Sequence, residues 1–165
     1  MSDLFDNTKA RTIKALSLWQ PWATLIARGL KLHETRHWLT DYRGPLAIHA
    51  AKTLDMAGAP AALCHAGLGR GWWDDCPLGA VVAVARLRRC RRTDGLDSLT
   101  RADQAAGNFL PGRFAWELAD VRALGEPIPL TGRQGLFNWA PPEDLEDRLG
   151  PVLDLQAAAA AIGWA

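Results

Sequence analysis

The stretch from Gly29 to Trp38 constrains the fold most, because it fits two incompatible secondary structures. Its segment 33–37 matches the H-E-x-x-H pattern of zinc proteases, in which a helix places two histidines one turn apart on the metal. As a strand, the same stretch sorts its side chains between two faces. One face then holds Leu32, Glu34, Arg36 and Trp38, and the other holds His33, Thr35 and His37. The helix predicts a zinc hydrolase using His33 and His37, whereas the strand predicts a charged and aromatic face.

The residues before this stretch favour the strand. Pro21 suits the first turn of a helix, and an apolar stripe at helical spacing follows it, formed by Trp22, Leu25 and Ile26. Gly29 is then the typical glycine that ends such a helix, so a helix through both histidines would have to cross its own stop signal. The sequence also has no glutamate between Glu34 and Glu117 to serve as a third zinc ligand. We therefore expect no metal and no other cofactor, and the zinc hydrolase is the less favoured alternative.

The bulk properties fit one globular domain. The 165 residues are 48% hydrophobic and 22% charged, and the net charge of +1 means that any nucleic-acid binding must come from a local patch. The three cysteines, Cys64, Cys76 and Cys90, form no C-x-x-C pair, which fits a reducing compartment. No apolar run approaches the ~20 residues of a membrane span, and the N-terminus is polar. We expect a cytoplasmic protein that is neither exported nor anchored to a membrane.

Hydrophobic periodicity outlines the remaining elements. Alternating or β-branched runs predict strands, and clusters of glycine and proline predict the turns between them. Besides 33–38, strands are expected at 13–18, 46–52, 79–85, 113–118 and 127–130, and 132–139 is expected to be a last turn followed by a short strand. Helices are expected at 22–29 and 53–66, and loops at 67–79 and 93–111, the second of them with a short helix.

The same patterns suggest a domain organisation. Residues 1–10 are expected to be a flexible tail, and residues 11–140 to form one domain that ends at a pair of prolines. Residues 141–165 begin with an acidic helix start and continue as an alanine-rich helix. We expect this C-terminal helical extension to pack on the domain through Leu153, Leu155, Ile162 and Trp164.

Five arginines fall within seven residues, namely Arg86, Arg88, Arg89, Arg91 and Arg92. If the preceding strand continues through them, they alternate between its faces and cannot all point the same way. The cluster fits a track for a nucleic-acid backbone and fits a solvated basic strand end equally well.

Five separate stretches of the chain follow one another in a characteristic order. They are LSLWQPWA (16–23), GLKLHETRHW (29–38), YRGPLAIHAAK (42–52), GAVVA (79–83) and QGLFNW (134–139). Together they resemble the ASCH domain, the activating-signal-cointegrator homology family within the PUA-like superfamily. The resemblance implies an α+β fold, a small PUA-like β-barrel of mixed, mostly antiparallel strands with flanking helices. It also implies a cleft that binds RNA or another nucleic acid, and some small bacterial relatives resemble hydrolases of acetylated cytidine or of RNA.

The motif G-x-K-x-x-E-x-R of this family falls on Lys31, Glu34 and Arg36. Amidohydrolases of this type that act on acetylcytidine have threonine where this chain has Glu34, and a carboxylate does not replace a hydroxyl nucleophile. We therefore expect the protein to bind single-stranded RNA or a nucleotide. The alternative is a metal-independent ribonuclease or N4-acetylcytidine-type amidohydrolase that uses Lys31 and Glu34 as catalytic residues. Spacing alone is equally compatible with an exposed ion pair without function.

The remaining candidate residues divide into aromatic and polar groups. Trp19 and Trp38 can stack on bases, whereas Trp22 belongs to the apolar helical stripe. Lys52 ends a buried strand and can reach a phosphate, whereas His49 within that strand is expected to be a satisfied core residue. The expected nucleic-acid-binding residues are Trp19, Gln20, Lys31, Arg36, Trp38, Tyr42, Arg43, Lys52 and Gln134, of which Tyr42 and Arg43 also fit a structural turn.

Overall fold

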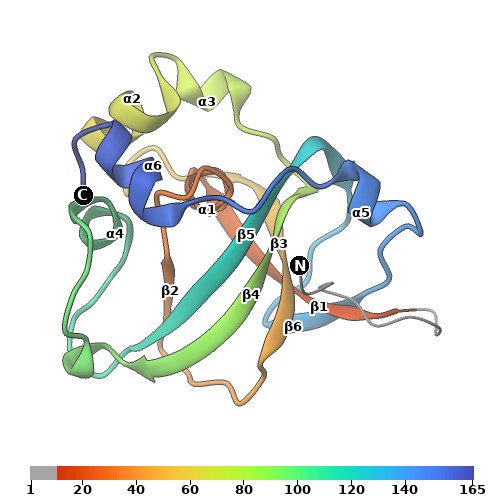
Figure 1. Cartoon of the computed structure of the whole chain (residues 1–165), viewed down its shortest axis with the longest axis horizontal. Helices are drawn as coiled ribbons and strands as arrows, with labels where there is room; N and C mark the ends of the chain where they lie inside the picture. Colours follow the sequence, from red (N-terminus) through yellow and green to blue (C-terminus); the bar gives the residue numbers. More distant parts are fainter. Residues whose placement is uncertain (1–10) are drawn as a thin grey trace.

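A mixed sheet forms the centre of the protein, which is described here from a computed structural model covering residues 11–165 (Figure 1). The expected flexible tail, residues 1–10, lies outside the described residues. Within the described part, six strands follow the order β2-β5-β4-β3-β1-β6, with β1 and β3 parallel and the other pairs antiparallel. They are β1 (Ile13–Gln20), β2 (His33–Arg36), β3 (Gly44–Leu54), β4 (Ala80–Arg92), β5 (Phe114–Pro129) and β6 (Leu136–Trp139).

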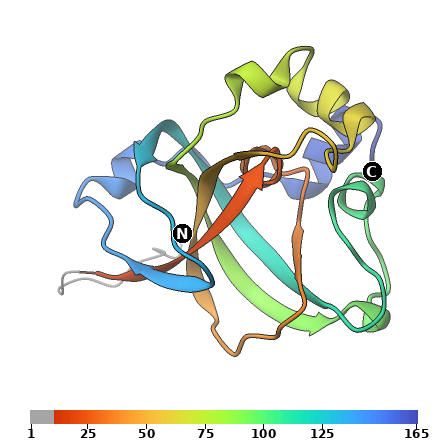
Figure 2. The same cartoon turned by 180° about the vertical axis from the view of Figure 1, so that it is seen from behind.

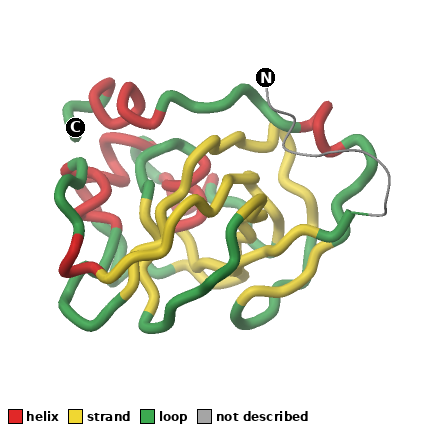
Figure 3. Tube along the Cα trace, turned by 60° about the horizontal axis from the view of Figure 1, so that its bottom comes forward, coloured by secondary structure: helices red, strands yellow, loops and turns green. Residues whose placement is uncertain are grey.

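Short helices flank this sheet. They are α1 (Trp22–Ala27), α2 (Ala61–Leu68), α3 (Trp72–Asp75), α4 (Arg101–Ala106), α5 (Leu145–Arg148) and α6 (Leu155–Ala161), with a 3-10 turn at Thr93–Gly95. Figure 2 shows the sheet from behind, with helices gathered along one end of its strands. In Figure 3 the curved sheet lies beneath the C-terminal segment. No described helix is long and apolar enough to cross a membrane.

The α+β class and the mostly antiparallel sheet are confirmed, but the sheet is not closed into a barrel, because β2 and β6 are its two edges. Three element boundaries were predicted wrongly. The segment 53–66, predicted as a helix, begins with the end of β3, and α2 starts only at Ala61, after Pro60. The predicted loop 67–79 contains α3. The predicted separate strand 127–130 is largely the end of β5, where β2 no longer pairs and β4 is the partner strand, so the prolines there are tolerated.

The two faces of the sheet have separate apolar cores. One core lies under α1 and includes Leu16, Ile48 and the fully buried Trp116. The ring of Trp38 packs edge-on against Trp116, with centroids 4.6 Å apart and an interplanar angle of 88°. The other core includes Val84 and Trp139 and packs against α5. The first core therefore holds the backbone after β2 in place, because Trp116 Nε1 also donates to the carbonyl of Trp38 at 3.3 Å.

The C-terminal segment packs on the rest of the protein, as its alanine-rich pattern suggested. Ala159 of α6 is fully buried, and the carbonyl of Trp164 accepts a hydrogen bond from the backbone of Ala102 at 3.0 Å. The guanidinium of Arg101 lies over the Trp164 ring at 5.0 Å. A domain boundary at residue 140 stays a prediction.

The three cysteines differ in burial, and this predicts their reactivity. Burial raises the pKa of the Cys64 thiol to about 11, helped by the neighbouring Cys76, whose pKa burial also raises. The thiolate is the reactive species, so Cys64 and Cys76 are protected at neutral pH. We expect iodoacetamide to label the half-buried Cys90 first, with Cys64 and Cys76 labelled only after unfolding. Peptide mass spectrometry after timed labelling measures this order, and faster labelling of Cys64 would contradict it.

Candidate nucleic-acid interface

The stretch that contains the motif forms a strand. Helix α1 ends at Ala27, and Gly29 takes a left-handed conformation with φ of 74°, as its role as a stop signal predicted. Strand β2 follows and pairs with β5, with Glu34 opposite Trp116 and Arg36 opposite Phe114. The helix required by a zinc-protease motif does not form, so the interpretation of His33 and His37 as zinc ligands on one helix is wrong. No group of three or more metal-binding side chains occurs within residues 11–165.

One face of β2 packs against α4 and the loop after it. His33 Nδ1 bonds to the carboxylate of Asp103, which is fully buried and also accepts from the backbone amides of Leu32 and His33 at 2.8 and 3.0 Å. Thr35 Oγ1 accepts a hydrogen bond from the Asn108 amide at 3.0 Å. This face is therefore occupied by the protein itself.

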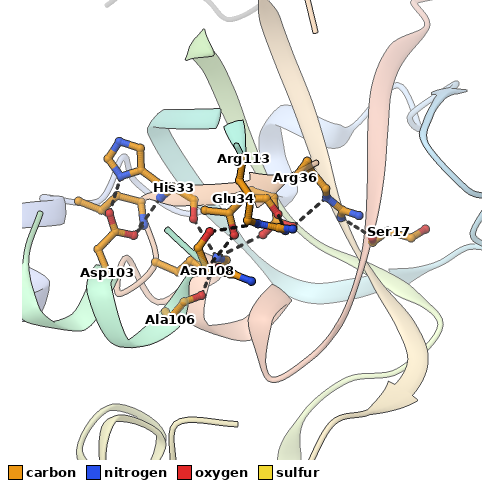
Figure 4. A network of polar contacts seen from close by, with 11 residues as sticks. Ser17, His33, Glu34, Arg36, Asp103, Ala106, Asn108 and Arg113 are labelled. Atoms are coloured by element: carbon orange, nitrogen blue, oxygen red, sulfur yellow. Dashed lines mark hydrogen bonds and ion pairs between the residues drawn. The ribbon is translucent and has the colours of Figure 1, made fainter. Parts of the chain in front are cut away.

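The other face holds a chain of charges that runs from Lys31 through Glu34 to Arg36. Figure 4 shows Glu34 and Arg36 of this chain beside Ser17 and Ala106. Lys31 is 2% exposed, and its ammonium donates to the carbonyls of His33 and Ala106 at 2.8 and 2.7 Å. Its third neighbour is Glu34 Oε2 at 3.2 Å. Glu34 Oε1 lies 2.9 Å from Arg36 Nε, and the terminal nitrogen of Arg36 donates to the carbonyl of Ser17 at 3.2 Å. The Lys31–Glu34 pair is buried and Arg36 is half-buried, so the charge chain is more than an exposed ion pair at a strand edge.

Arg36 is also where this charge chain meets a pocket of about 760 Å³, which we call the main pocket. Two tryptophans line it: Trp19, which is 55% exposed, and the half-buried Trp38. Its basic side chains are Arg36, His37, His49, Lys52 and Arg133, and no carboxylate among the described residues lines it. The main pocket therefore combines aromatic surface with cationic groups.

The buried His49 fixes one wall of the main pocket. It is 1% exposed, and its Nε2 lies 2.7 Å from the carbonyl of Leu130 while its Nδ1 lies 2.9 Å from Ser17 Oγ. Because a carbonyl can only accept, Nε2 holds the proton and Nδ1 accepts from the hydroxyl in the neutral ring. A Cβ on Gly132 would lie 2.5 Å from the His49 ring, so only glycine lets this loop pass. The prediction of His49 as a satisfied core residue is confirmed.

The loop after Leu130 supplies the neighbouring part of the lining, with Arg133 and Gln134 exposed. Lys52 lies near the C-terminal end of β3, and its side chain is positioned by packing rather than by a hydrogen bond. Its side chain lies against Gly79, where an added Cβ would meet Lys52 Cε at 2.9 Å. Gly79 also has a positive φ of 64°, so the turn before β4 both requires glycine and makes room for Lys52.

Five of the nine predicted binding residues line the main pocket, namely Trp19, Arg36, Trp38, Lys52 and Gln134. The other four have internal partners. Gln20 is fully buried between the Thr24 amide and the Pro77 carbonyl, and Lys31 is buried as described above. The Tyr42 hydroxyl donates to the Pro45 carbonyl, and Arg43 donates to the carbonyls of Thr40 and Tyr42. Tyr42 and Arg43 thus hold the turn before β3, and all four stay outside the pocket lining.

Sequence reasoning missed several pocket residues, and Ser17, Gly132 and Arg133 show which signals were available. In the sequence, Ser17 is an ordinary polar position of a half-buried strand. In the structure it bonds His49 and lies in the wall of the main pocket. Gly132 and Arg133 directly precede the predicted Gln134. The two glycines around Arg133 and Gln134, Gly132 and Gly135, were the available signal of a loop at a ligand site.

The chain is similar to known proteins in sequence and in structure. The model of the ASCH domain matches residues 16–128, more than half of the chain. Among solved structures, the chain is similar to the crystal structure of ASCH from Zymomonas mobilis, with a TM-score of 0.47 and 15% sequence identity. That similarity covers 85% of this chain and 97% of the other. No curated protein matches significantly.

Proposed function

Because the chain belongs to the ASCH domain family, we propose that it is an RNA-binding protein and that its main pocket holds single-stranded RNA or a nucleotide. Exposed tryptophans give a base a surface to stack on, and this contact is tolerant of base identity. Basic side chains beside them neutralise the phosphate. The proposal rests on the combination of Trp19 and Trp38 with Arg36 and Lys52 in one pocket that no carboxylate of residues 11–165 lines.

Arg36 and Lys52 have different roles in the proposed binding. Arg36 is held by Glu34 and by the Ser17 carbonyl, so its guanidinium has a fixed position at the pocket wall. Lys52 is exposed and forms no hydrogen bond or ion pair with the described residues, so its ammonium is available to a phosphate. Gln134 is an exposed amide that can donate to and accept from a base edge. Stacking and phosphate contact together favour a nucleotide over a neutral aromatic ligand.

Hydrolysis through Lys31 and Glu34 is the second candidate and stays a prediction. The observation in its favour is a small pocket of about 340 Å³ lined by Lys31, Glu34 and Thr35. Against it, the Lys31 ammonium already has three acceptors within 3.2 Å, so its N–H donors are occupied by the protein itself. The Lys31→Met variant distinguishes a catalytic role of Lys31 from a structural one.

We predict that Lys52→Ala weakens RNA binding and reduces its salt dependence. Fluorescence anisotropy with a labelled single strand of about 12 nucleotides measures both, over a series of salt concentrations. Loss of one phosphate contact lowers the slope of log K against log salt by about 0.7 for a single strand. Lys14→Ala is the matched control, because Lys14 is also exposed at its tip but bonds Asn138 at 2.7 Å, away from the main pocket. Equal slopes for both variants would place the binding site elsewhere.

A further inference from the structure

The arginines at the end of β4 form an unusual surface that the main pocket does not include. Strand β4 continues through all of them, from Ala80 to Arg92. Arg86 and Arg92 at the two ends of the cluster each bond their own carboxylate, Asp120 and Asp94. Three arginines lie between them, Arg88, Arg89 and Arg91, and we call these the arginine row.

The arginine row shares a single counter-charge. All three guanidinium groups lie around Glu117 of β5, at 3.5, 4.0 and 3.6 Å from its oxygens. These separations are ion-pair distances, and none of the three guanidinium groups forms a hydrogen bond with another described residue. Three positive charges against one carboxylate leave two uncompensated. Each guanidinium therefore keeps N–H donors free for an anion.

The arginine row is open to solvent while Glu117 lies beneath it. The arginine side chains are 55%, 51% and 40% exposed, and that of Glu117 is 19% exposed. An anion arriving from solvent meets the guanidinium groups before it meets the carboxylate. Guanidinium groups match phosphate oxygens through paired N–H donors, so phosphate is the anion that this surface fits best.

The register of the sheet connects the arginine row to the main pocket. Arg36 of the pocket wall lies opposite Phe114 of β5, and Phe114 lies opposite Arg92 of β4. Adjacent strands are about 4.8 Å apart, so the backbone of Arg92 lies about 10 Å from that of Arg36. Strands β2 and β4 end at these residues and β5 begins there, at the lower end of the sheet in Figure 1. Glu117 lies opposite His33 and Arg89, so the arginine row is on the face of the sheet away from the Arg36 side chain. A chain of phosphates that leaves the pocket beside Arg36 therefore passes around this end of the sheet to reach the arginine row.

We propose that the arginine row is a second binding site for the phosphate backbone of the RNA strand whose base or nucleotide lies in the main pocket. The inference rests on the proposed function and extends it, because it makes affinity depend on strand length. A trinucleotide occupies the main pocket alone, whereas a strand of about 12 nucleotides also reaches the arginine row. Glu117 then limits affinity, because it competes with phosphate for the same guanidinium groups.

The test compares two ligand lengths with three variants by fluorescence anisotropy over a salt series. For the long strand, replacing Arg88, Arg89 and Arg91 together by alanine is expected to weaken binding on the order of tenfold. Three lost contacts should also lower the salt slope by about 2. Binding of the trinucleotide should stay unchanged. Glu117→Gln is expected to have the opposite effect: it should raise the affinity for the long strand and leave the affinity for the trinucleotide unchanged.

The matched control replaces three exposed arginines elsewhere, Arg28, Arg70 and Arg148, by alanine. This control changes the net charge by the same amount. A difference in affinity between the two triple variants therefore depends on where the arginines lie and not on the total charge. Melting curves confirm that each variant is folded. An unchanged affinity and salt slope for the long strand in the arginine-row variant would overturn the proposal, and so would equal losses in the control. If the trinucleotide fails to bind at all while the long strand depends on the arginine row, the main-pocket proposal fails and the arginine row stands.

Discussion

Lys31→Met is expected to destabilise the protein by about 3 kcal/mol, because it removes the charged group from a buried cluster. Lys31 is 2% exposed, and its three N–H donors meet the His33 carbonyl, the Ala106 carbonyl and Glu34. Methionine keeps the apolar length of the side chain but leaves these acceptors without a donor. Arg36 remains beside Glu34, so we expect the lower end of the usual range for a broken buried pair. For a chain of this size the melting temperature should fall by about 6–12 °C.

Lys14→Met is the control for this experiment, because the Lys14 ammonium forms one exposed hydrogen bond, to Asn138. Its melting temperature should change little. Calorimetry measures stability, and mass spectrometry of RNA and acetylcytidine incubated with each folded variant measures hydrolysis. A Lys31→Met protein with unchanged melting but lost hydrolysis would show that Lys31 is catalytic, contrary to the structural role that its contacts indicate.

Local signals in the sequence were sufficient for the strand that organises the site. Gly29 ended helix α1, and β2 then sorted its side chains by alternation, which placed Glu34 and Arg36 together and His33 and Thr35 on the opposite face. Such signals act within a few residues, so they are readable without the fold. The same holds for the β-branched start of β4.

Long-range pairing was not readable in this way. Strand β5 runs unbroken from Phe114 to Pro129 because β4 accompanies it over nearly this length with three irregularities in register. Its sequence contains Gly125 and two prolines, which locally favour a turn. The helix predicted at 53–66 was wrong for the opposite reason. Its alanine content suggested a helix, but β1 and β3 still pair as far as Leu54. Tertiary contacts override local propensity in both cases.

The candidate site shows the same division. The motif residues Lys31, Glu34 and Arg36 were found from their spacing, yet spacing could not show that Lys31 is buried beneath α4 and its loop. Burial depends on Ala106, which lies 75 positions away in the chain. Ser17 and His49 likewise meet only because β1 and β3 are parallel neighbours with these two residues in register. Side chains at a strand surface are therefore predictable, whereas their neighbours across the sheet are not.

Trp19→Ala is expected to cause the largest loss of RNA affinity of any single change in the main pocket. Trp19 is 55% exposed, so its indole ring is available to a base without any rearrangement of the core. Stacking of one base on an aromatic ring contributes about 1–3 kcal/mol, which corresponds to a loss of roughly 5-fold to 150-fold in affinity. Because the contact does not involve phosphate, the salt slope should stay the same, unlike in Lys52→Ala. Anisotropy with the trinucleotide measures both quantities.

Two further variants make this expectation specific. Trp19→Phe should retain most of the affinity, because it keeps an aromatic face for stacking. Trp73→Ala is the matched control, since Trp73 is 40% exposed on α3 and lies outside the main pocket. Removing this second exposed tryptophan should leave affinity unchanged. If Trp19→Ala binds as tightly as the unaltered protein, the base does not stack on this ring. Trp38 would then be the remaining aromatic group of the pocket, and a ligand held by phosphate alone would keep its affinity in every tryptophan variant.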